Sequence, residues 1–463
     1  MAKRSEISFR RIFRTRVVLT ALPLSVLLIA YARYVLVTPP ETVAGLIAAT
    51  VTVFLFALVG IRFVPDLLSA WTDGEEYPIR RLEGRRSGRR SRLHPFFGLM
   101  LLLIVWRLIL FAFAYGIDCA GNGYRGGIFD SMGLWNQIGS DSRHYLSIAE
   151  NGYVNTGDDR LLIVFFPFYP LVVRAANYFF DSYLTSGLFV SNVCALFAGY
   201  VFYELCLIDY DRRTSLRMLK FLCILPAAFL LGAPLSDSVF LLLSLLCVYC
   251  VRRERYLIGC FVGGLAAFTR APGLLLTVPV VTELVMRAVR EKKVGRTVGR
   301  ALCVLLIPMG FVAYLAVNYG VTGNPFMFLV YQKSHWHQQL GWFFASAATE
   351  ADYLVSSIGA DRELLYGLWV PNLVSMVLGL AVLVVSGRKL RASNTAYFLV
   401  YYAVTMGATW LLSAPRYLVC CYPIAMGLGL ITKRRSVNLI VTLLLLAGTA
   451  AYLYAYVNGW YVY

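Results

Sequence analysis

Long apolar segments separated by short polar ones form the dominant pattern along this chain. A helix needs about 20 mostly apolar residues to cross the hydrocarbon layer of a bilayer. Candidate segments of this kind cover 17–37, 42–64, 96–116, 184–207, 217–233, 236–251, 256–270, 272–287, 301–318, 366–386, 395–412, 416–431 and 437–457. The pattern therefore predicts an all-α polytopic membrane protein with about 13 transmembrane helices.

The first apolar segment has the features of a retained span. It carries Arg33 near its end, and no small-residue cleavage site follows it. A secretory signal peptide has a shorter apolar region and such a site. We therefore expect residues 17–37 to remain in the mature protein.

Composition agrees with a membrane protein and argues against other classes. Hydrophobic residues make up 59% of the 463 residues, and the mean hydropathy is +0.67, whereas a soluble protein needs more polar surface. The net charge of +18 does not indicate nucleic-acid binding, since no basic segment interleaves with stacking aromatics. The ten cysteines include one CxxC, Cys247 to Cys250, inside an apolar segment, where packing is the preferred interpretation. They predict neither a disulfide framework nor a zinc site.

The basic residues give an orientation. With a cytoplasmic N-terminus, most of the 43 lysines and arginines fall on the cytoplasmic side, as the positive-inside rule requires. These inner segments are 3–16, 80–92, 212–220, 252–255, 287–300, 388–391 and 433–435. They hold 32 of the 43, and eight fall outside. The other three, Arg33, Arg62 and Arg107, lie in spans or near their ends, where long side chains can reach the interface. This scheme places the C-terminus outside.

One apolar segment does not fit a simple count of spans. Residues 161–180 (LLIVFFPFYPLVVRAANYFF) are apolar enough to cross, but counting them would invert every later loop. Pro167 and Pro170 also interrupt a helix there, and Arg174 lies inside the segment. We expect an interfacial or re-entrant element.

Three parts follow from this topology. Residues 1–64 form an accessory two-helix unit, and residues 65–95 form a basic cytoplasmic linker. Residues 96–463 form the transmembrane core. Two long extracytoplasmic loops of the core, about 117–183 and 319–365, are expected to carry short interfacial helices.

Charged residues at outer turns are the candidates for chemistry, because ionisable groups at membrane depth are costly. Asp141 lies in SDSRHYLSIAENGY, Asp237 in APLSDS, Arg270 in AAFTRAPG and Arg416 in LSAPRYL. Each arginine stands beside a proline at an outer turn. Two such arginines favour a shared anion site.

Structural alternatives exist for each of these residues. Asp237 could be a helix N-cap, the two arginines could reach for outer headgroups, and Asp141 could be a solvated loop acid. His335 and His337 alternate as on a strand, but a metal site needs more ligands. Loop surface is the preferred interpretation of the histidines, and no metal or cofactor is predicted.

Seven segments, in order, resemble the family of GPI mannosyltransferase II and its bacterial relatives in the GT-C glycosyltransferase superfamily. They are DSRHYLSIAENGY, FFPFYPLVVR, SNVCALFAGYVFY, PLSDSVFLLLSL, LAAFTRAPGLLL, GNPFMFLVYQKSHW and SAPRYLVCCYP. The resemblance runs from about residue 96 to the C-terminus. The chain departs from it at Ser140, where the family usually has Trp, and at Asp237, where the family has Glu.

The resemblance implies a GT-C-like fold and a lipid-phosphate-linked donor, typically dolichyl- or polyprenyl-phosphate mannose, used by an inverting enzyme. A sugar that leaves as a phosphate needs cations at the departing oxygens and one base for the attacking hydroxyl. We assign Asp141 as the base and Arg270 and Arg416 as phosphate ligands. The base is expected to face the arginines across a gap wide enough for one sugar. Further substrate-binding candidates are Arg143, His144, Tyr145, Asp237, Gln332, His335 and Trp336.

The expected partners are the lipid-linked donor, membrane lipids and a glycan, glycolipid or protein acceptor. A transporter or flippase of lipid-linked sugars is the alternative, although it would place polar groups near the midplane. A structural scaffold would not explain Asp141 together with two arginines. The chain has no N-x-S/T sequon, which favours a bacterial plasma membrane, with the site on the extracytoplasmic face, over an endoplasmic reticulum.

Overall fold

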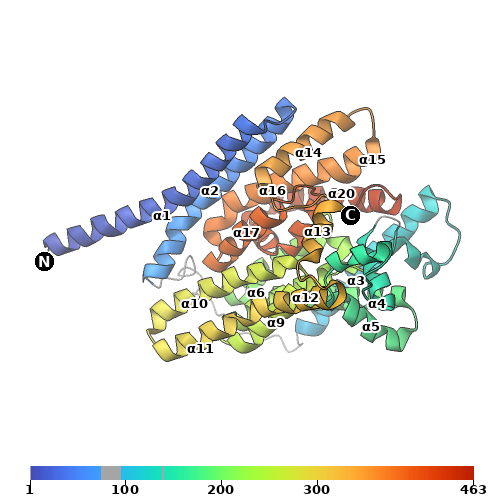
Figure 1. Cartoon of the computed structure of the whole chain (residues 1–463), viewed down its shortest axis with the longest axis horizontal. Coiled ribbons are helices and arrows are strands. Elements are labelled where there is room, and N and C mark those ends of the chain that lie inside the picture. The colour runs from blue at the N-terminus through green and yellow to red at the C-terminus, as the bar shows by residue number, and fades with distance from the viewer. Residues whose placement is uncertain (1, 74–94, 138–139) are drawn as a thin grey trace.

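The computed structural model describes residues 2–73, 95–137 and 140–463, which are almost entirely helical (Figure 1). Within this part, the one isolated bridge pairs Leu340 with Ala408. The all-α polytopic class predicted from hydropathy is confirmed. The linker expected at 65–95 lies largely outside the described residues, and the preceding helix continues to Asp73.

Eight helical segments of the described chain are long and apolar enough to cross a membrane. Four are α1 (Ala2–Val37), α2 (Val43–Asp73), α3 (Pro95–Gly121) and α6 (Tyr183–Asp209). The others are η6 (Ala271–Leu276) with α10 (Thr277–Glu291), α11 (Val294–Val304) with α12 (Leu306–Thr322), α15 (Arg362–Leu364) through η7 (Leu365–Trp369) to α16 (Val370–Ser386), and α20 (Arg435–Val457).

The remaining expected spans are shorter or bent, so thirteen spans are not found. They correspond to α7 (Arg212–Ile224) with η5 (Ala228–Gly232), α8 (Asp237–Arg252), α9 (Tyr256–Thr269), α17 (Ala392–Thr405), and α18 (Ala414–Cys420) with α19 (Pro423–Ile431). The 14 residues of α9 extend only about 21 Å, and α18 meets α19 at 81°. Counting each bent pair as one span gives at most ten in the described chain. Hydropathy counts apolar segments and does not reveal where a helix stops partway.

Residues 161–180 form no straight helix. They belong to η4 (Asp158–Val164) and α5 (Phe168–Phe180), which meet at 109°. Pro167 lies at the bend, where it cannot donate the hydrogen bond that a continuous helix requires. This geometry agrees with the interfacial or re-entrant element expected from the charge pattern.

The first two helices attach to the rest of the protein through α2, which packs against α16 and α14 (Phe343–Ser357). Asp352 of α14 accepts hydrogen bonds from the backbone N–H groups of Glu41 and Thr42, each at 3.0 Å. These bonds satisfy backbone donors just before α2. The N-terminal part of α1 extends away from the body of the molecule (Figure 1).

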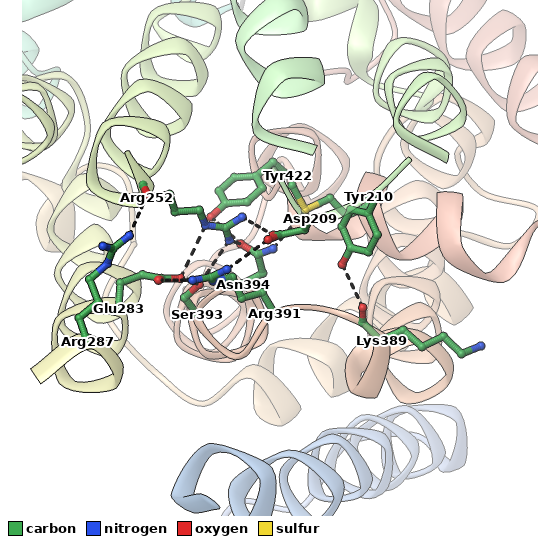
Figure 2. A network of polar contacts seen from close by, with 11 residues as sticks. Asp209, Tyr210, Arg252, Glu283, Arg287, Lys389, Arg391, Ser393, Asn394 and Tyr422 are labelled. Atoms are coloured by element: carbon green, nitrogen blue, oxygen red, sulfur yellow. Dashed lines mark hydrogen bonds and ion pairs between the residues drawn. The ribbon is translucent and has the colours of Figure 1, made fainter. Parts of the chain in front are cut away.

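A buried group of charges joins four helices at the end of the molecule that carries Arg252 and Lys389 (Figure 2). We call Asp209, Arg252, Glu283 and Arg391 the basal ion cluster. Arg252 donates to Asp209 at 2.6 Å, and Arg391 donates to both oxygens of Glu283 at 2.6 and 2.8 Å.

Arg391 also reaches Asp209 at 3.2 Å, so the basal ion cluster is closed and carries no net charge. Its members come from α6, α8, α10 and the residue before α17. Removing one partner of such a buried pair costs about 3–5 kcal/mol. The cluster therefore fixes the four helices relative to one another.

Helix α8 connects this cluster to the opposite end of the molecule. Arg252 is its last residue and Asp237 is its first, so 16 residues separate the two ends by about 24 Å. The acidic residue lies at the N-terminus and the basic one at the C-terminus, which suits the helix dipole.

Candidate active site

Four charged side chains from distant parts of the sequence meet at one place. Asp141 begins α4 (Asp141–Asn151), Asp237 begins α8, Arg270 follows α9, and Arg416 lies in α18. Asp141 and Arg416 are 275 residues apart in the sequence. We call these four residues the cavity ion cluster.

Helix α4 is held at both ends, and this fixes the backbone of Asp141. Ser140 is the N-cap, and its hydroxyl accepts a hydrogen bond from the N–H of Ser142. At the other end, Arg174 of α5 donates to the carbonyl oxygens of Ala149 at 2.6 Å and Glu150 at 3.1 Å. The bent η4–α5 element thus positions the helix that carries the acid.

Arg416 is positioned by the start of α18. Asn372 of α16 accepts a hydrogen bond from the N–H of Ala414 at 3.0 Å and donates to the carbonyl of Leu411 at 2.9 Å. Pro415 occupies the first turn of α18, where its missing N–H costs nothing.

Asp237 is the centre of the cavity ion cluster. Its side chain is 1% exposed, and each carboxylate oxygen accepts from a different arginine. Arg416 donates through Nε to Oδ2 at 2.7 Å, and Arg270 donates through Nη1 to Oδ1. The two arginines therefore share one carboxylate, as their expected convergence requires. The ion pairs show that Asp237 is more than a helix cap and that neither arginine simply reaches for headgroups.

Asp141 occupies a different environment. It accepts from Nη1 of Arg416 at 2.6 Å, and its side chain is 34% exposed whereas that of Arg416 is 4% exposed. The expectation that the base would stand apart from the arginines is therefore wrong for this conformation. The reason is electrostatic: without Asp141 the arginines would outnumber the carboxylates by two to one.

Tyr145 lies one turn along α4 from Asp141 and remains a neutral phenol. Burial raises the pKa of Tyr145 to about 12, and the nearby Arg270 and Arg416 only partly oppose this effect. Its hydroxyl hydrogen-bonds Ser236 at 2.8 Å, next to Asp237. Tyr145 therefore joins α4 to the residue before α8 and cannot act as a base near neutral pH.

A cavity of about 900 Å³ opens in front of the cluster. Its polar lining consists of Asp141, His144, Tyr145, Arg270, Gln332, Lys333, Gln338, Gln339, Ser413 and Arg416. Apolar side chains also line it, among them Leu274, Leu275, Phe311, Phe326, Phe328, Leu329 and Leu340. Several of these apolar side chains are largely exposed on the protein surface, including Phe326 at 51% and Leu340 at 75%.

The residues expected at the site divide into three groups. Those that line the cavity are Asp141, His144, Tyr145, Arg270, Gln332, Trp336 and Arg416. Asp237 lies behind the two arginines. Arg143 and His335 are exposed and do not line the cavity: Arg143 donates to the carbonyl of Asn136, and the His335 ring lies 6.0 Å from that of Tyr331.

Sequence reasoning missed three features of the site. Lys333 of α13 (Met327–Ser334) adds a cation to the cavity wall, and it stands next to Gln332 within one of the recognised segments. The ring of Tyr417 lies 5.3 Å from the Arg270 guanidinium, which fits a cation–π contact. Cys420 approaches Asp237 at 3.6 Å. Tyr417 and Cys420 follow Arg416 by one and four residues, so a helix there could have suggested them.

No group of three or more His, Cys, Asp or Glu side chains suited to a metal ion occurs among the described residues. The chemistry available in this part of the chain is that of a carboxylate, two arginines and a lysine in the lining of a cavity. Such a set can bind an anion and accept a proton from a hydroxyl group.

The fold and the site define a class: a polytopic helical membrane protein with a cluster of two acids and two arginines at a cavity that apolar side chains also line. Residues 128–319 match the family model described as mannosyltransferase (PIG-V). This segment contains Asp141, Asp237 and Arg270. The match confirms the resemblance to this family that the motifs indicated.

Among solved structures, the crystal structure of ArnT from Cupriavidus metallidurans bound to undecaprenyl phosphate is similar at 15% sequence identity and a TM-score of 0.43. The similarity covers 79% of this chain and 76% of the ArnT chain. No curated protein sequence matches the chain.

Proposed function

We propose that this protein is a membrane glycosyltransferase that moves mannose from a polyprenyl-phosphate-linked donor to an acceptor hydroxyl on the extracytoplasmic side. One observation carries the proposal: Asp141, Arg270 and Arg416 meet in the lining of a cavity that is also lined by many apolar side chains. The match of residues 128–319 to a mannosyltransferase family supports the choice of sugar.

The chemistry follows from these side chains. The donor phosphate lies against Arg416 and Arg270, and the polyprenyl chain follows the apolar lining toward Phe326 and Leu340. The acceptor hydroxyl attacks the anomeric carbon from the side opposite the phosphate, so the configuration inverts. Asp141 takes the hydroxyl proton, and the arginines stabilise the charge on the departing phosphate.

The size of the cavity suits this substrate. About 900 Å³ is near the upper end of the range for small-molecule sites, roughly 300–1,000 Å³. A sugar phosphate, the first isoprene units and an acceptor hydroxyl group fit in such a volume. The exposed apolar lining gives a long lipid chain an exit toward the bilayer.

The orientation proposed here comes from the basic residues. Arg252 and Arg287 lie together at the C-terminal end of α8, where Arg287 donates to the carbonyl of Arg252 at 2.8 Å (Figure 2), and the cavity ion cluster lies at the other end of α8. If the basic end is cytoplasmic, the cavity is extracytoplasmic. We propose the plasma membrane of a bacterium as the site of action.

Turnover by purified protein tests the proposal. The protein is incubated with polyprenyl-phosphate [³H]mannose and a lipid extract as acceptor, and released polyprenyl phosphate and labelled acceptor are measured. Asp141→Asn keeps the size of the side chain but removes its basicity, so turnover should fall about 100-fold or more, the usual scale for a positioned general base.

Arg143→Gln is the matched control, because Arg143 is exposed and lies outside the cavity lining. It should turn over normally. Near-normal turnover in folded Asp141→Asn would show that Asp141 is not the base. Movement of the labelled lipid across a liposome membrane without release of polyprenyl phosphate would instead indicate a flippase.

A further inference from the structure

The cavity ion cluster contains two kinds of ion pair. The pair between Asp237 and Arg416 is closed off, with side chains 1% and 4% exposed. The pair between Asp141 and Arg416 has one partner that is 34% exposed. An anion that enters the cavity can therefore compete with Asp141 for Arg416. It cannot replace Asp237, because that ion pair is buried.

The geometry of Arg416 allows this exchange without loss of its position. Arg416 uses Nε for Asp237 and Nη1 for Asp141. The Nε bond and the second arginine on Asp237 hold the guanidinium in place while the Nη1 edge changes partner. A guanidinium edge binds carboxylate and phosphate oxygens with similar geometry.

We propose, on the basis of the function proposed above, that the donor phosphate displaces Asp141 from Arg416 and so turns Asp141 into a competent base. In the ion pair, Oδ2 of Asp141 accepts from Nη1 of Arg416 at 2.6 Å, so that oxygen is not free to accept the proton of an acceptor hydroxyl. Once the phosphate occupies the Nη1 edge, Asp141 loses its partner and is exposed to the cavity. Donor binding therefore comes before activation of the acceptor.

The transfer step then balances. The oxygen of the acceptor hydroxyl forms a bond to the anomeric carbon while the bond from that carbon to the phosphate oxygen breaks. The electron pair leaves with the phosphate, which Arg416 and Arg270 hold. The hydroxyl proton goes to Asp141. In this order, Asp141 becomes available as a base only after the donor is bound.

Binding of undecaprenyl phosphate tests the exchange. In detergent-solubilised protein, Asp141→Asn should bind this lipid more tightly than the parent protein, by about 3- to 10-fold, because the competing charge is removed; a tenfold change corresponds to about 1.4 kcal/mol. Asp158→Asn is the matched control, since Asp158 is an exposed acid of η4 in the same outer loop. It should leave the affinity unchanged.

The possible outcomes separate this inference from the proposed function. If the parent protein transfers mannose but folded Asp141→Asn binds the lipid no more tightly, or more weakly, the displacement is wrong and the function stands. If the parent neither binds undecaprenyl phosphate nor releases it from the donor, both fail. Asp141→Ser removes the same charge and replaces Asp141→Asn if thermal unfolding shows that the asparagine variant is not folded.

Discussion

At the scale of single residues, Asp237 sets the charge that the phosphate meets. With Arg270 and Arg416 it carries a net charge of +1, which matches the single charge of a phosphodiester donor. The polyprenyl phosphate product is a monoester with a charge of about −1.5 to −2 at neutral pH. Lys333, which also lines the cavity, is a further cation that can balance the extra negative charge of the product. No carboxylate among the described residues pairs with it.

The fork of each arginine should matter more than its charge. The ammonium group in Arg416→Lys lacks the planar guanidinium, whose two edges can bind Asp237 and a phosphate at the same time. The kcat/KM for the donor should therefore fall roughly 10-fold or more. In Arg270→Lys, kcat/KM for the donor should fall less, since Arg270 contacts only one of the two acids. Initial rates at varied donor concentration measure both effects, with Arg143→Lys as the control. Full activity in both variants would show that these arginines do not bind phosphate.

The identities of the main site residues could be predicted from the sequence, and their contacts could not. Asp141, Arg270 and Arg416 stood out because a charge beside an apolar segment is costly unless it is used. The ion pair between Asp141 and Arg416 depends on how segments 275 residues apart fold together, and no local pattern encodes that. Lys333 was missed because a lysine at the end of a short helix resembles any solvated residue.

At the scale of elements, Arg107 of α3 shows why the segment before Asp237 has a defined shape. It was expected to extend toward the interface, but it donates to Asn192 at 3.1 Å and to the carbonyls of Ala228 and Phe229 at 3.2 Å each. These carbonyls belong to η5, where a short 3₁₀ helix leaves acceptors unsatisfied. Arg107 thus supplies donors to the irregular backbone that leads into α8.

Gly232 makes room for this contact. A Cβ at position 232 would collide with the Arg107 guanidinium, so Gly232→Ala should lower the stability by about 1–3 kcal/mol, as overpacking does. Gly98→Ala is the control, because a Cβ at that position of α3 meets nothing within 4 Å. Thermal unfolding in detergent compares the two variants. Equal midpoints would mean that Arg107 can move away at no cost.

The short helices explain why the element count differed from the prediction. Hydropathy located the apolar segments well, including α8 and α9, but it treats 14 and 16 residues as nearly equal to 20. The α18–α19 pair was predicted as one span, although Pro423 begins α19 directly after the 81° bend and a proline favours a helix boundary. Packing against neighbouring helices decides such bends.

At the scale of the whole molecule, orientation in the membrane can be measured directly. Arg213 is exposed at the start of α7 and should face the cytoplasm, and Tyr178 at the end of α5 is 90% exposed and should face outward. In intact cells, a membrane-impermeant maleimide should label Tyr178→Cys and not Arg213→Cys, above the labelling of the parent's own ten cysteines. Ser215 lies in the same basic segment, but it is buried and therefore unsuitable for labelling. The reverse labelling would invert the topology.

The basal ion cluster also has a consequence for how the protein is made. Synthesis proceeds from the N-terminus, so Asp209, Arg252 and Glu283 enter the membrane before Arg391 has been translated. Until then the three side chains hold two negative charges against one positive charge, and a buried charge without a partner costs several kcal/mol. The early helices therefore cannot settle into their final packing on their own. The final packing of these early helices therefore depends on a residue that is translated after all of them.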